Sequence, residues 1–427
     1  MHILFLTHYF PPEVNAPASR TFEHARRWVQ AGHRVTVITC APNCPTGKVF
    51  PGYRNAWRTE EDAAGIRVIR VWTFLSANKG FALRTLNFVS YLLTAVWHAL
   101  WLRQIDVVVA TSPQFFCGWA GVLCHWLRRW PFVLEIRDIW PESIVAVGAM
   151  RRSRLMRLLE WLERRMYAAA DHIVTVGNGY RDQLAARQVP PDKITVVPNG
   201  VDLEQFRPQP ADADLRQQWG GTNRFVCAYV GTIGMAHGLE VVLKAAARLR
   251  ELGRNDIQFW IVGDGAERDA LQQQARAQGL EHVVFTGLVP KDRVDAVLAS
   301  ADACLVHLRG TELFGTVIPS KVFEMLAMQT PIVMGVRGEA QEIVCAARGG
   351  VAMTPDDPLS LIAALAEIAA HPDRYRHGRS YVERYYNRNI LAQRMLDVML
   401  AVGRGQRPAA DSAAATTQNG SPRRCAA

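Results

Sequence analysis

The sequence lacks the patterns of several common protein classes. Its eight cysteines form no Cys-x-x-Cys pair and no Cys/His cluster with zinc spacing, which argues against a zinc ribbon or a thioredoxin-type redox site. The opening residues MHILFLTHYF have no basic segment and no small-residue cleavage site, so we interpret them as a first strand rather than a signal peptide. The Lys/Arg-aromatic interleaving of an RNA-binding sheet is also absent. We therefore expect no nucleic-acid partner.

Acidic residues are scarce in the first half of the chain. Residues 1–200 contain 24 Lys and Arg against 14 Asp and Glu, whereas residues 201–427 contain 25 of each. The whole formal excess of +10 therefore lies in the first half. Such asymmetry predicts an anionic partner for that half.

Formal charge is missing altogether from residues 85–102, TLNFVSYLLTAVWHALWL. Its 18 residues reach the length of a membrane-spanning helix. A span, however, would separate strands 2–6 and 106–112, which we expect in one sheet. Two readings stay open: a helix packed within the first domain, or a helix that dips into the membrane interface with Trp97 and Trp101.

A basic amphipathic helix is predicted at 151–166, RRSRLMRLLEWLERRM. Its arginines form either a solvated face or a contact with anionic lipid, where each basic residue contributes about 1 kcal/mol. Together with the uncharged stretch, it favours a cytoplasmic protein attached peripherally to the anionic inner face of the plasma membrane.

The alternation of strand-like and helix-like runs predicts an α/β fold. Buried strand patterns such as DVVVATS (106–112) and FVCAYVG (225–231) are followed by helical periodicity, as in parallel sheets covered by helices. A chain of 427 residues is also too long for one core. We predict two Rossmann-like domains facing a central cleft. Their ranges are 1–200 and 201–375, followed by a helix at 376–402 that crosses back to the first domain and a disordered tail at 403–427.

Two glycine-containing turns are candidates for a nucleotide site. VGTIGMAHGLE (230–240) ends a strand and begins a helix; it is either a phosphate cradle or a plain tight turn. IVGDGAERDAL (261–271) has Gly263 and Gly265, but Arg268 occupies the third glycine position of a dinucleotide fingerprint. This argues against a dehydrogenase.

The segment PSKVFEMLAMQTP (319–331) places a cation and a carboxylate at the start of an apolar helix. Ser320 is a candidate N-cap. Lys321 and Glu324 are three residues apart, so they share a helix face. They form either an ordinary first-turn ion pair or a divided site, in which the lysine binds phosphate oxygens and the glutamate accepts hydrogen bonds from ribose hydroxyls.

Four ordered motifs resemble those of the family 4 glycosyltransferases, which have the two-Rossmann GT-B fold. They are VVPNGVDLEQF (196–206), IVGDGAERDAL, VVFTGLVP (283–290) and PSKVFEMLAMQTPIV (319–333), and the resemblance extends to about residue 400. It implies transfer of a sugar from a nucleotide sugar with retention of anomeric configuration. It also implies no cofactor and no metal, because protein groups neutralise the diphosphate.

The chain departs from the family pattern at three places. Glu324 matches the second glutamate of the family's E-x7-E motif, but Thr316 stands where the first is expected. Glu312 in the preceding loop is a candidate replacement. Thr232 and His237 stand where the family has an arginine and a lysine in the first phosphate loop.

The resemblance implies the following site. The diphosphate contacts Lys321, His237 and the amides near Gly231 and Gly234, with Gly263 beside the nucleotide; the ribose contacts Glu324; the base contacts the backbone at Gly287, Val289 and Pro290; the donor sugar contacts Glu312 and Thr316. In the first domain, Arg137 and Asp138 would face the reacting sugar as catalytic residues alongside Lys321 and Glu324, or form a structural ion pair. His8, Glu13 and Asn15 follow the first strand and either meet the acceptor or are simply polar loop residues.

The segment LEIRDIWPES (134–143) resembles a bacterial branch that makes surface polysaccharides, including transferases for N-acetylfucosamine-type sugars. The branch implies a UDP-linked amino sugar as donor and an undecaprenyl-diphosphate-linked acceptor, in O-antigen, capsule or exopolysaccharide synthesis. Two alternatives stay open: a GT-B nucleotide-sugar 2-epimerase and a non-catalytic nucleotide-sugar sensor.

Overall fold

The chain divides into two compact α/β units. The structure is a computed structural model that describes residues 1–44, 47–76, 81–112, 115–139 and 154–409. Unit 1 contains Met1–Pro198 and the segment that begins at Arg388, and unit 2 contains Asn199–Asn387. The prediction of two Rossmann-like α/β domains is confirmed. Of the predicted tail at 403–427, residues 410–427 lie outside the described residues.

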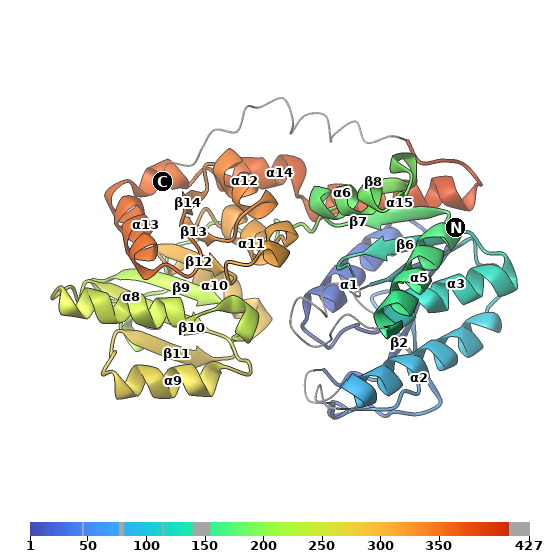
Figure 1. Ribbon diagram of the computed structural model, residues 1–427, viewed down its shortest axis with the longest axis horizontal. Coiled ribbons are helices and arrows are strands. Elements are labelled where there is room, and N and C mark those ends of the chain that lie inside the picture. The colour runs from blue at the N-terminus through green and yellow to red at the C-terminus, as the bar shows by residue number, and fades with distance from the viewer. Residues whose placement is uncertain (45–46, 77–80, 113–114, 140–153, 410–427) are drawn as a thin grey trace. The chain divides into compact units, whose positions relative to one another are not determined.

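Unit 1 is built on an eight-stranded sheet with the order β3-β4-β2-β1-β5-β6-β7-β8 (Figure 1). All neighbours are parallel except β3 and β4. Most strands are apolar on both faces, as expected where helices cover both sides of a parallel sheet. The strands are β1 (His2–Leu6), β2 (Arg34–Cys40), β3 (Arg58–Ala63), β4 (Ile66–Val71), β5 (Val107–Thr111), β6 (Phe132–Ile136), β7 (His172–Thr175) and β8 (Ile194–Val196).

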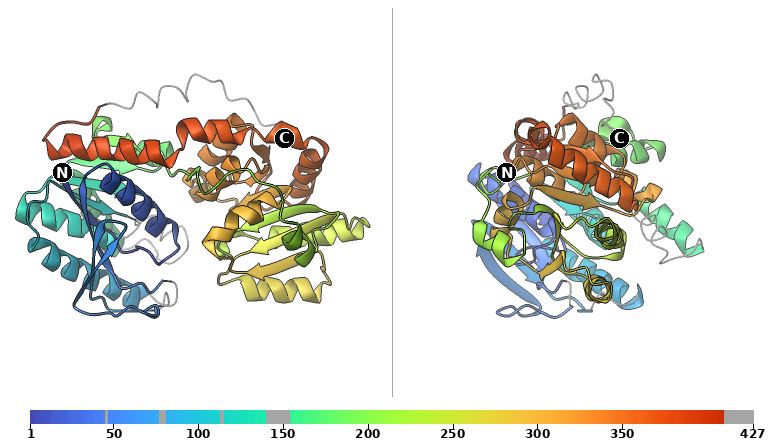
Figure 2. Two further views of the ribbon diagram at one scale, coloured as in Figure 1. Left: turned by 180° about the vertical axis from the view of Figure 1, so that it is seen from behind. Right: turned by 90° about the vertical axis from the view of Figure 1, so that its left-hand side faces the viewer.

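Helices cover both faces of this sheet. Alternate strand residues such as Leu4 and Val108 pack with α2, α3 and α5, whereas Ile3 and Val107 pack with α1 and α15, because successive side chains of a strand point to opposite faces. Figure 2 shows the same layers from behind. The helices are α1 (Ala16–Gln30), α2 (Phe81–Leu100), α3 (Phe115–Arg128), α5 (Arg154–Ala169), α6 (Asn178–Ala186) and α15 (Arg388–Gly403).

The predicted return helix at 376–402 consists of two helices. The first, α14 (Gly378–Tyr385), belongs to unit 2, and only α15 belongs to unit 1. On unit 1, the indole Nε1 of Trp28 donates to the carbonyl of Ala392 at 2.9 Å. Leu391 and Met395 are buried in the same cluster. Unit 1 is therefore closed by the last helix of the described chain.

Unit 2 is built on a six-stranded parallel sheet with the order β11-β10-β9-β12-β13-β14. One face packs against α10, α11, α12 and α14, and the other against α8, α9 and α13. The elements are α7 (Ala213–Gln218), β9 (Phe225–Val230), α8 (Glu240–Glu251), β10 (Ile257–Val262), α9 (Arg268–Ala277), β11 (Val283–Gly287), α10 (Val294–Ala299), β12 (Ala303–His307), α11 (Lys321–Ala327), β13 (Ile332–Gly335), α12 (Glu339–Ala346), β14 (Gly350–Ala352) and α13 (Pro358–Ala370), with short 3-10 helices η2 (Met235–His237), η3 (Lys291–Arg293), η4 (Glu312–Thr316) and η5 (Pro372–Tyr375). A further 3-10 helix, η1 (Pro191–Lys193), belongs to unit 1.

Candidate functional site

Three neighbouring strands of unit 2 end on glycines whose backbones touch. The Gly231 amide donates to Val262 and the Gly263 amide to Gly287, both at 2.9 Å. A Cβ added at Gly263 would lie 1.9 Å from the Gly231 carbonyl oxygen, far inside any real contact. The carboxyl ends of β9, β10 and β11 are thus held together by backbone contacts that only glycine permits.

Gly231 has a different role from the predicted one. Its amide is already bonded to Val262, so it does not offer a free N–H to a phosphate. Instead, a Cβ at Gly231 would lie 2.7 Å from the Nζ atom of Lys321. Among the described residues, the amides of Thr232 and Gly234 have no acceptor. These two amides, rather than that of Gly231, are available to an anion.

The loop after β9 is clamped by residues that sequence reasoning missed. The Arg309 amide donates to Ala236 at 2.9 Å, and its guanidinium donates to Glu240 at 2.9 Å. The buried ring of His307 contacts the His237 carbonyl at 2.7 Å and the Asp356 amide at 2.9 Å. The only signal in the sequence is the position of these two residues just at and after the end of β12, a strand next to the loop's own strand.

Lys321 points its amine into this glycine-lined corner. Its Nζ atom lies 4.0 Å from the centre of the Tyr229 ring. The side chain as a whole is partly exposed, yet the nitrogen is buried and has no hydrogen-bond partner among the described residues. Burial lowers the pKa of Lys321 to about 8, against the opposing charge of Glu324. A buried ammonium without a hydrogen-bond partner is energetically costly.

Glu324 lies one turn further along α11. Burial raises its pKa to about 7, although Lys291 and Lys321 both favour the charged form. No ion pair joins Lys321 to Glu324 in the described part of the chain. The reading as an ordinary first-turn ion pair is therefore not what the structure shows. A perturbed carboxyl beside a perturbed amine at strand ends is the signature of a ligand site.

The predicted cap of α11 is wrong. Ser320 has helical dihedral angles (φ −56°, ψ −30°), and its side chain makes no capping hydrogen bond. The turn is set instead by Pro319, whose carbonyl accepts from the Val322 amide at 3.0 Å. Lys321 consequently begins the helix with its amine on the β9 side.

The other residues predicted to bind the donor lie after β9, after β11 and before α11. Burial, followed by the charge of Lys321, lowers the pKa of His237 to about 4, so its ring is neutral at pH 7 and supplies no charge to phosphate. The Gly287 carbonyl is used by Gly263, and Val289 is partly buried against the core, next to Pro290. Glu312 and Thr316 are the first and last residues of η4.

In unit 1, Arg137 and Asp138 follow the end of β6, as predicted. Arg20 from α1 binds Glu135 at 2.9 Å and the backbone carbonyls of Val197 and Pro198 at 2.9 and 2.7 Å. Burial lowers the pKa of Arg137 to about 10, so it remains charged, and its Nη1 atom is buried without a partner in the described residues. No local pattern marks Arg20, because its partner Glu135 lies 115 positions away in the sequence.

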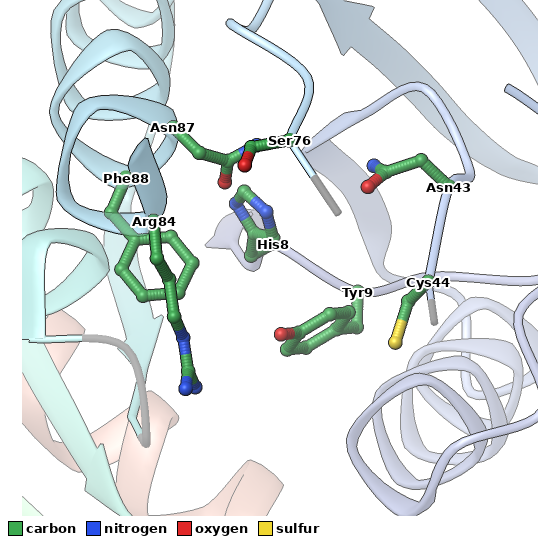
Figure 3. Close-up of a pocket in the computed structure, with 8 residues that line it drawn as sticks. All are labelled: His8, Tyr9, Asn43, Cys44, Ser76, Arg84, Asn87 and Phe88. Carbon is green, nitrogen blue, oxygen red and sulfur yellow. The ribbon is translucent and has the colours of Figure 1, made fainter. Parts of the chain in front are cut away.

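The three predicted acceptor residues meet at the ends of β1 and β2. Glu13 accepts from the amides of Asn43 and Cys44 at 2.9 and 2.8 Å, and Asn15 caps α1 by accepting from Ala18 at 3.0 Å. His8 lines a small pocket (Figure 3). Glu13 and Asn15 therefore shape this region, while the buried His8 ring forms part of the pocket wall.

The helices α2, α3 and α5 expose large apolar side chains on one face of unit 1. Neither α2 nor α3 contains an acidic residue. None of the helices in the described residues combines the length and hydropathy that a membrane crossing requires. Within the same residues, no group of three His, Cys, Asp or Glu side chains is arranged to hold a metal ion. The exposed side chains are Leu83, Leu86, Leu93 and Trp97 on α2, Trp101 directly after its last residue, Trp126 and Leu127 on α3, and Leu158 and Trp161 on α5.

Comparison with known proteins gives two family matches. Residues 15–200 match the glycosyl transferase 4-like domain, and residues 224–371 match the glycosyl transferases group 1 domain. The chain is 26% identical over 412 residues to the colanic acid biosynthesis glycosyl transferase WcaI of Escherichia coli, covering 93% of this chain and all of WcaI. It is 26% identical over 273 residues to the glycosyltransferase WbjE of Pseudomonas aeruginosa, covering 62% of this chain and 66% of WbjE.

Solved structures resemble the whole chain in fold. A sucrose-phosphate synthase from Thermosynechococcus elongatus has a TM-score of 0.72 at 18% identity, covering 95% of this chain and all of that chain. HepE from Anabaena, in complex with UDP and glucose, has a TM-score of 0.68 at 18% identity, covering 93% and 99%. At these identities the likeness establishes the fold.

Proposed function

The chain belongs to the family 4 glycosyltransferases of GT-B fold, and from this premise we propose that it transfers an N-acetylated amino sugar, with retention, from a UDP-sugar to a lipid-linked glycan in surface-polysaccharide synthesis. The observation that carries the donor half of the proposal is the unpaired Lys321 amine beside Glu324. WcaI, named for colanic acid biosynthesis, and HepE, solved with UDP, support the pathway class and the nucleotide.

The residues of unit 2 divide the nucleotide between them. Lys321 and the amides of Thr232 and Gly234 bind the diphosphate, because a buried ammonium and free backbone N–H groups both favour negative charge. Glu324 accepts from the two ribose hydroxyls. When the donor binds, the phosphate replaces the missing partner of the Lys321 amine and raises its pKa.

The chemical step needs no protein nucleophile. The acceptor hydroxyl attacks the anomeric carbon from the side of the departing diphosphate, the bond from that carbon to the diphosphate oxygen breaks, and this oxygen takes the hydroxyl proton. Lys321 stabilises the negative charge that develops on the diphosphate. In unit 1, Arg137 and Asp138 are assigned to contacts with the reacting sugar. Metal is not required, since protein charges neutralise the phosphates.

Unit 1 supplies the membrane side of the proposal. The exposed tryptophans Trp97, on α2, and Trp101, directly after its last residue, enter the interface of the inner leaflet, as amphipathic aromatic side chains do. Arginines around them contact anionic lipid, each contributing about 1 kcal/mol. The undecaprenyl-diphosphate-linked acceptor is then reached from the surface that holds its lipid. The exposed arginines are Arg84, Arg103, Arg128, Arg129, Arg157, Arg164 and Arg165.

Thermal unfolding with UDP, GDP, ADP, CDP and TDP tests the donor site. Ligand at 100 times its Kd stabilises the folded state by about 2.7 kcal/mol. We expect a shift with UDP, its loss in Glu324→Ala, and its retention in Glu342→Ala, an exposed glutamate of α12. No shift with any nucleotide would overturn the proposal, and UDP binding with sugar epimerised but never transferred would favour the 2-epimerase.

Vesicle co-sedimentation tests the membrane surface. We expect binding to phosphatidylglycerol vesicles, weak binding to phosphatidylcholine, and a loss of about tenfold when Trp97 and Trp101 are changed to serine, since each change removes an interfacial indole. Leu359→Ser, at an exposed leucine of unit 2, is the matched control. Equal binding of both variants would contradict the assignment.

A further inference from the structure

Tyr229 is a buried residue of β9 that contacts both of the groups assigned above to the diphosphate. It lies one residue before the end of the strand and is 1% exposed. A buried tyrosine contributes a large apolar ring to the core, and its hydroxyl needs a hydrogen-bond partner. A side chain buried to this extent does not bind a ligand directly. It acts through the residues that it contacts.

The hydroxyl of Tyr229 fixes one peptide group in the loop after β9. It donates to the Thr232 carbonyl at 2.6 Å. The amide of the same peptide group, that of Ile233, donates to the Asp264 carbonyl at 2.9 Å. The peptide groups on either side of it carry the amides of Thr232 and Gly234, which have no acceptor within the described part of the chain. The hydroxyl therefore helps to orient the two N–H groups that are available to an anion.

The loop as a whole presents hydrogen-bond donors to a ligand. Each of the six carbonyls of residues 232–237 already accepts a hydrogen bond from within unit 2. Only the positive ends of the peptide dipoles then remain for a ligand, which favours an anion. In the order of the carbonyls, the donors are the Tyr229 hydroxyl, the amides of Glu267 and His237, Nε and the amide of Arg309, and the ring of His307.

The ring of Tyr229 faces the amine of Lys321. The Nζ atom lies 4.0 Å from the ring centre, where the negative face of an aromatic ring attracts an ammonium group, most strongly away from water. The same nitrogen has no hydrogen-bond partner among the residues that the structure describes. The ring thus favours the charged form of Lys321 at the place where a phosphate would meet it.

We infer that Tyr229 is a positioning residue for the donor: its hydroxyl orients the loop amides and its ring holds the Lys321 ammonium, so that both meet one diphosphate. The phenol ring is rigid, so a single side chain fixes the loop after β9 relative to the start of α11. The inference rests on the proposed function and adds a residue that acts without touching the ligand.

Two variants separate the two contacts of Tyr229. Tyr229→Phe removes the hydroxyl, and Tyr229→Leu removes the ring as well. Calorimetry on the full chain measures the affinity for UDP, and ligand-observed NMR measures the affinity for uridine. UDP should bind about fivefold more weakly to Tyr229→Phe, as for one neutral hydrogen bond, and about 30-fold more weakly to Tyr229→Leu.

Uridine lacks the phosphates and serves as the reference ligand. Its affinity should stay within about twofold of the native value in both variants, because ribose and base do not contact the groups that Tyr229 holds. Tyr375→Phe is the matched control. Tyr375 is a buried tyrosine of unit 2 whose hydroxyl bonds Glu367 at 2.6 Å, and its variant should keep the native affinity for both ligands.

The pH dependence of UDP binding gives a second measurement, which a loss of folding stability would not change. The pKa of Lys321 is about 8, and removal of the ring should lower it, since the ring favours the ammonium. From pH 7 to 9.5, UDP affinity should begin to fall about one pH unit earlier in Tyr229→Leu, whereas Tyr229→Phe should keep the native profile.

The other titratable groups near the amine do not distinguish the variants. His237 and Cys304 stay neutral in this range, because burial moves their pKa values to about 4 and about 12. Burial also raises the pKa of Tyr229. Glu324 has a pKa of about 7 and is present in all of the proteins compared.

The outcomes separate this inference from the proposed function. Equal losses of UDP and uridine binding would show a general loss of structure and overturn the inference. Native UDP affinity in Tyr229→Leu, or an equal loss in Tyr375→Phe, would also overturn it, while UDP binding by the native protein would leave the donor site standing. Absence of UDP binding by the native protein would instead overturn the proposed function.

Discussion

Each unit buries charge near its strand ends, but the two units treat that charge differently. In unit 1, Arg20 is bonded to Glu135 and to two backbone carbonyls. Burial alone would raise the pKa of Glu135, yet Arg20 and Arg137 reverse this and lower it. In unit 2, Lys321 and Glu324 have no such partners within the part of the chain that the structure describes, and the pKa of each is shifted in the direction that favours its neutral form.

The difference separates a structural ion pair from a binding site. A buried ion pair whose arginine also bonds backbone carbonyls connects separate segments, here α1, β6 and the end of the first segment of unit 1, although the Oε2 atom of Glu135 has no hydrogen-bond partner among the described residues. A buried charge without a partner destabilises the free protein and gains most when a ligand supplies the missing charge. Substitutions in the two clusters should therefore change stability in opposite directions.

Arg20→Met should give the largest effect. It leaves Glu135 charged and buried, which costs about 3–5 kcal/mol for a broken buried pair. Hydrogen exchange should show the loss in peptides of unit 1, while UDP affinity stays unchanged. The double variant Arg20→Met/Glu135→Leu should regain part of the loss, because no carboxylate is stranded. A loss below about 1 kcal/mol would mean that the pair is not structural.

Lys321→Met should not lower the stability of the ligand-free protein, in contrast to Arg20→Met. It removes a buried unpaired ammonium, so the ligand-free protein should unfold at the same temperature or higher. UDP affinity should fall about 10- to 100-fold, as expected for a hydrogen bond to a charged group worth about 1.5–3 kcal/mol. Calorimetry with and without UDP measures both the unfolding temperature and the UDP affinity. A lower unfolding temperature with unchanged affinity would make Lys321 structural.

The raised pKa of Glu324 predicts that the free energy of unfolding depends on pH. Its pKa is raised from 4.5 to about 7 in the folded protein. The stabilisation from its neutral form is thus complete below about pH 4.5 and is lost as pH rises through 7. Glu324→Gln should be more stable than the native protein above pH 7, by about 1–2 kcal/mol after allowance for partial exposure, and equal to it near pH 4. Urea unfolding of both proteins across this pH range tests the prediction. A stability difference that does not change with pH would contradict the raised pKa of Glu324.

His237→Gln should give the smallest effect. The ring is neutral at pH 7, because its pKa is about 4, so only a neutral hydrogen bond of about 1 kcal/mol is at stake. UDP affinity should fall less than about fivefold, equally at pH 6 and pH 8. A loss that is larger at pH 6 than at pH 8 would show that the histidine carries charge at the lower pH.

The sequence was informative where pattern and local spacing decide the outcome. Buried strands such as 106–112 and 225–231 follow from local hydrophobicity. Two strands at the sheet edges carry little such signal: β3 reads RTEEDA, with few apolar residues, and β14 has three residues.

Long-range geometry explains what the sequence could not reveal. The spacing of Lys321 and Glu324 suggested a shared face, but only the fold turns the amine onto Tyr229 and against Gly231. The clamp residues His307 and Arg309 bond His237 and Glu240, which lie 70 and 69 positions away in the sequence. The pocket around His8 likewise gathers residues from three separate segments, which no local motif marks.

The packing of α15 on unit 1 sets an order for biosynthesis. Met395 and Met399 complete the core that contains Ile3 and Val107, yet the ribosome adds them after all of unit 2. The nascent chain of unit 1 must therefore wait, with part of its sheet uncovered, while unit 2 is synthesised. A stop codon just before Arg388 would leave unit 2 whole and make unit 1 a client of chaperones and proteases.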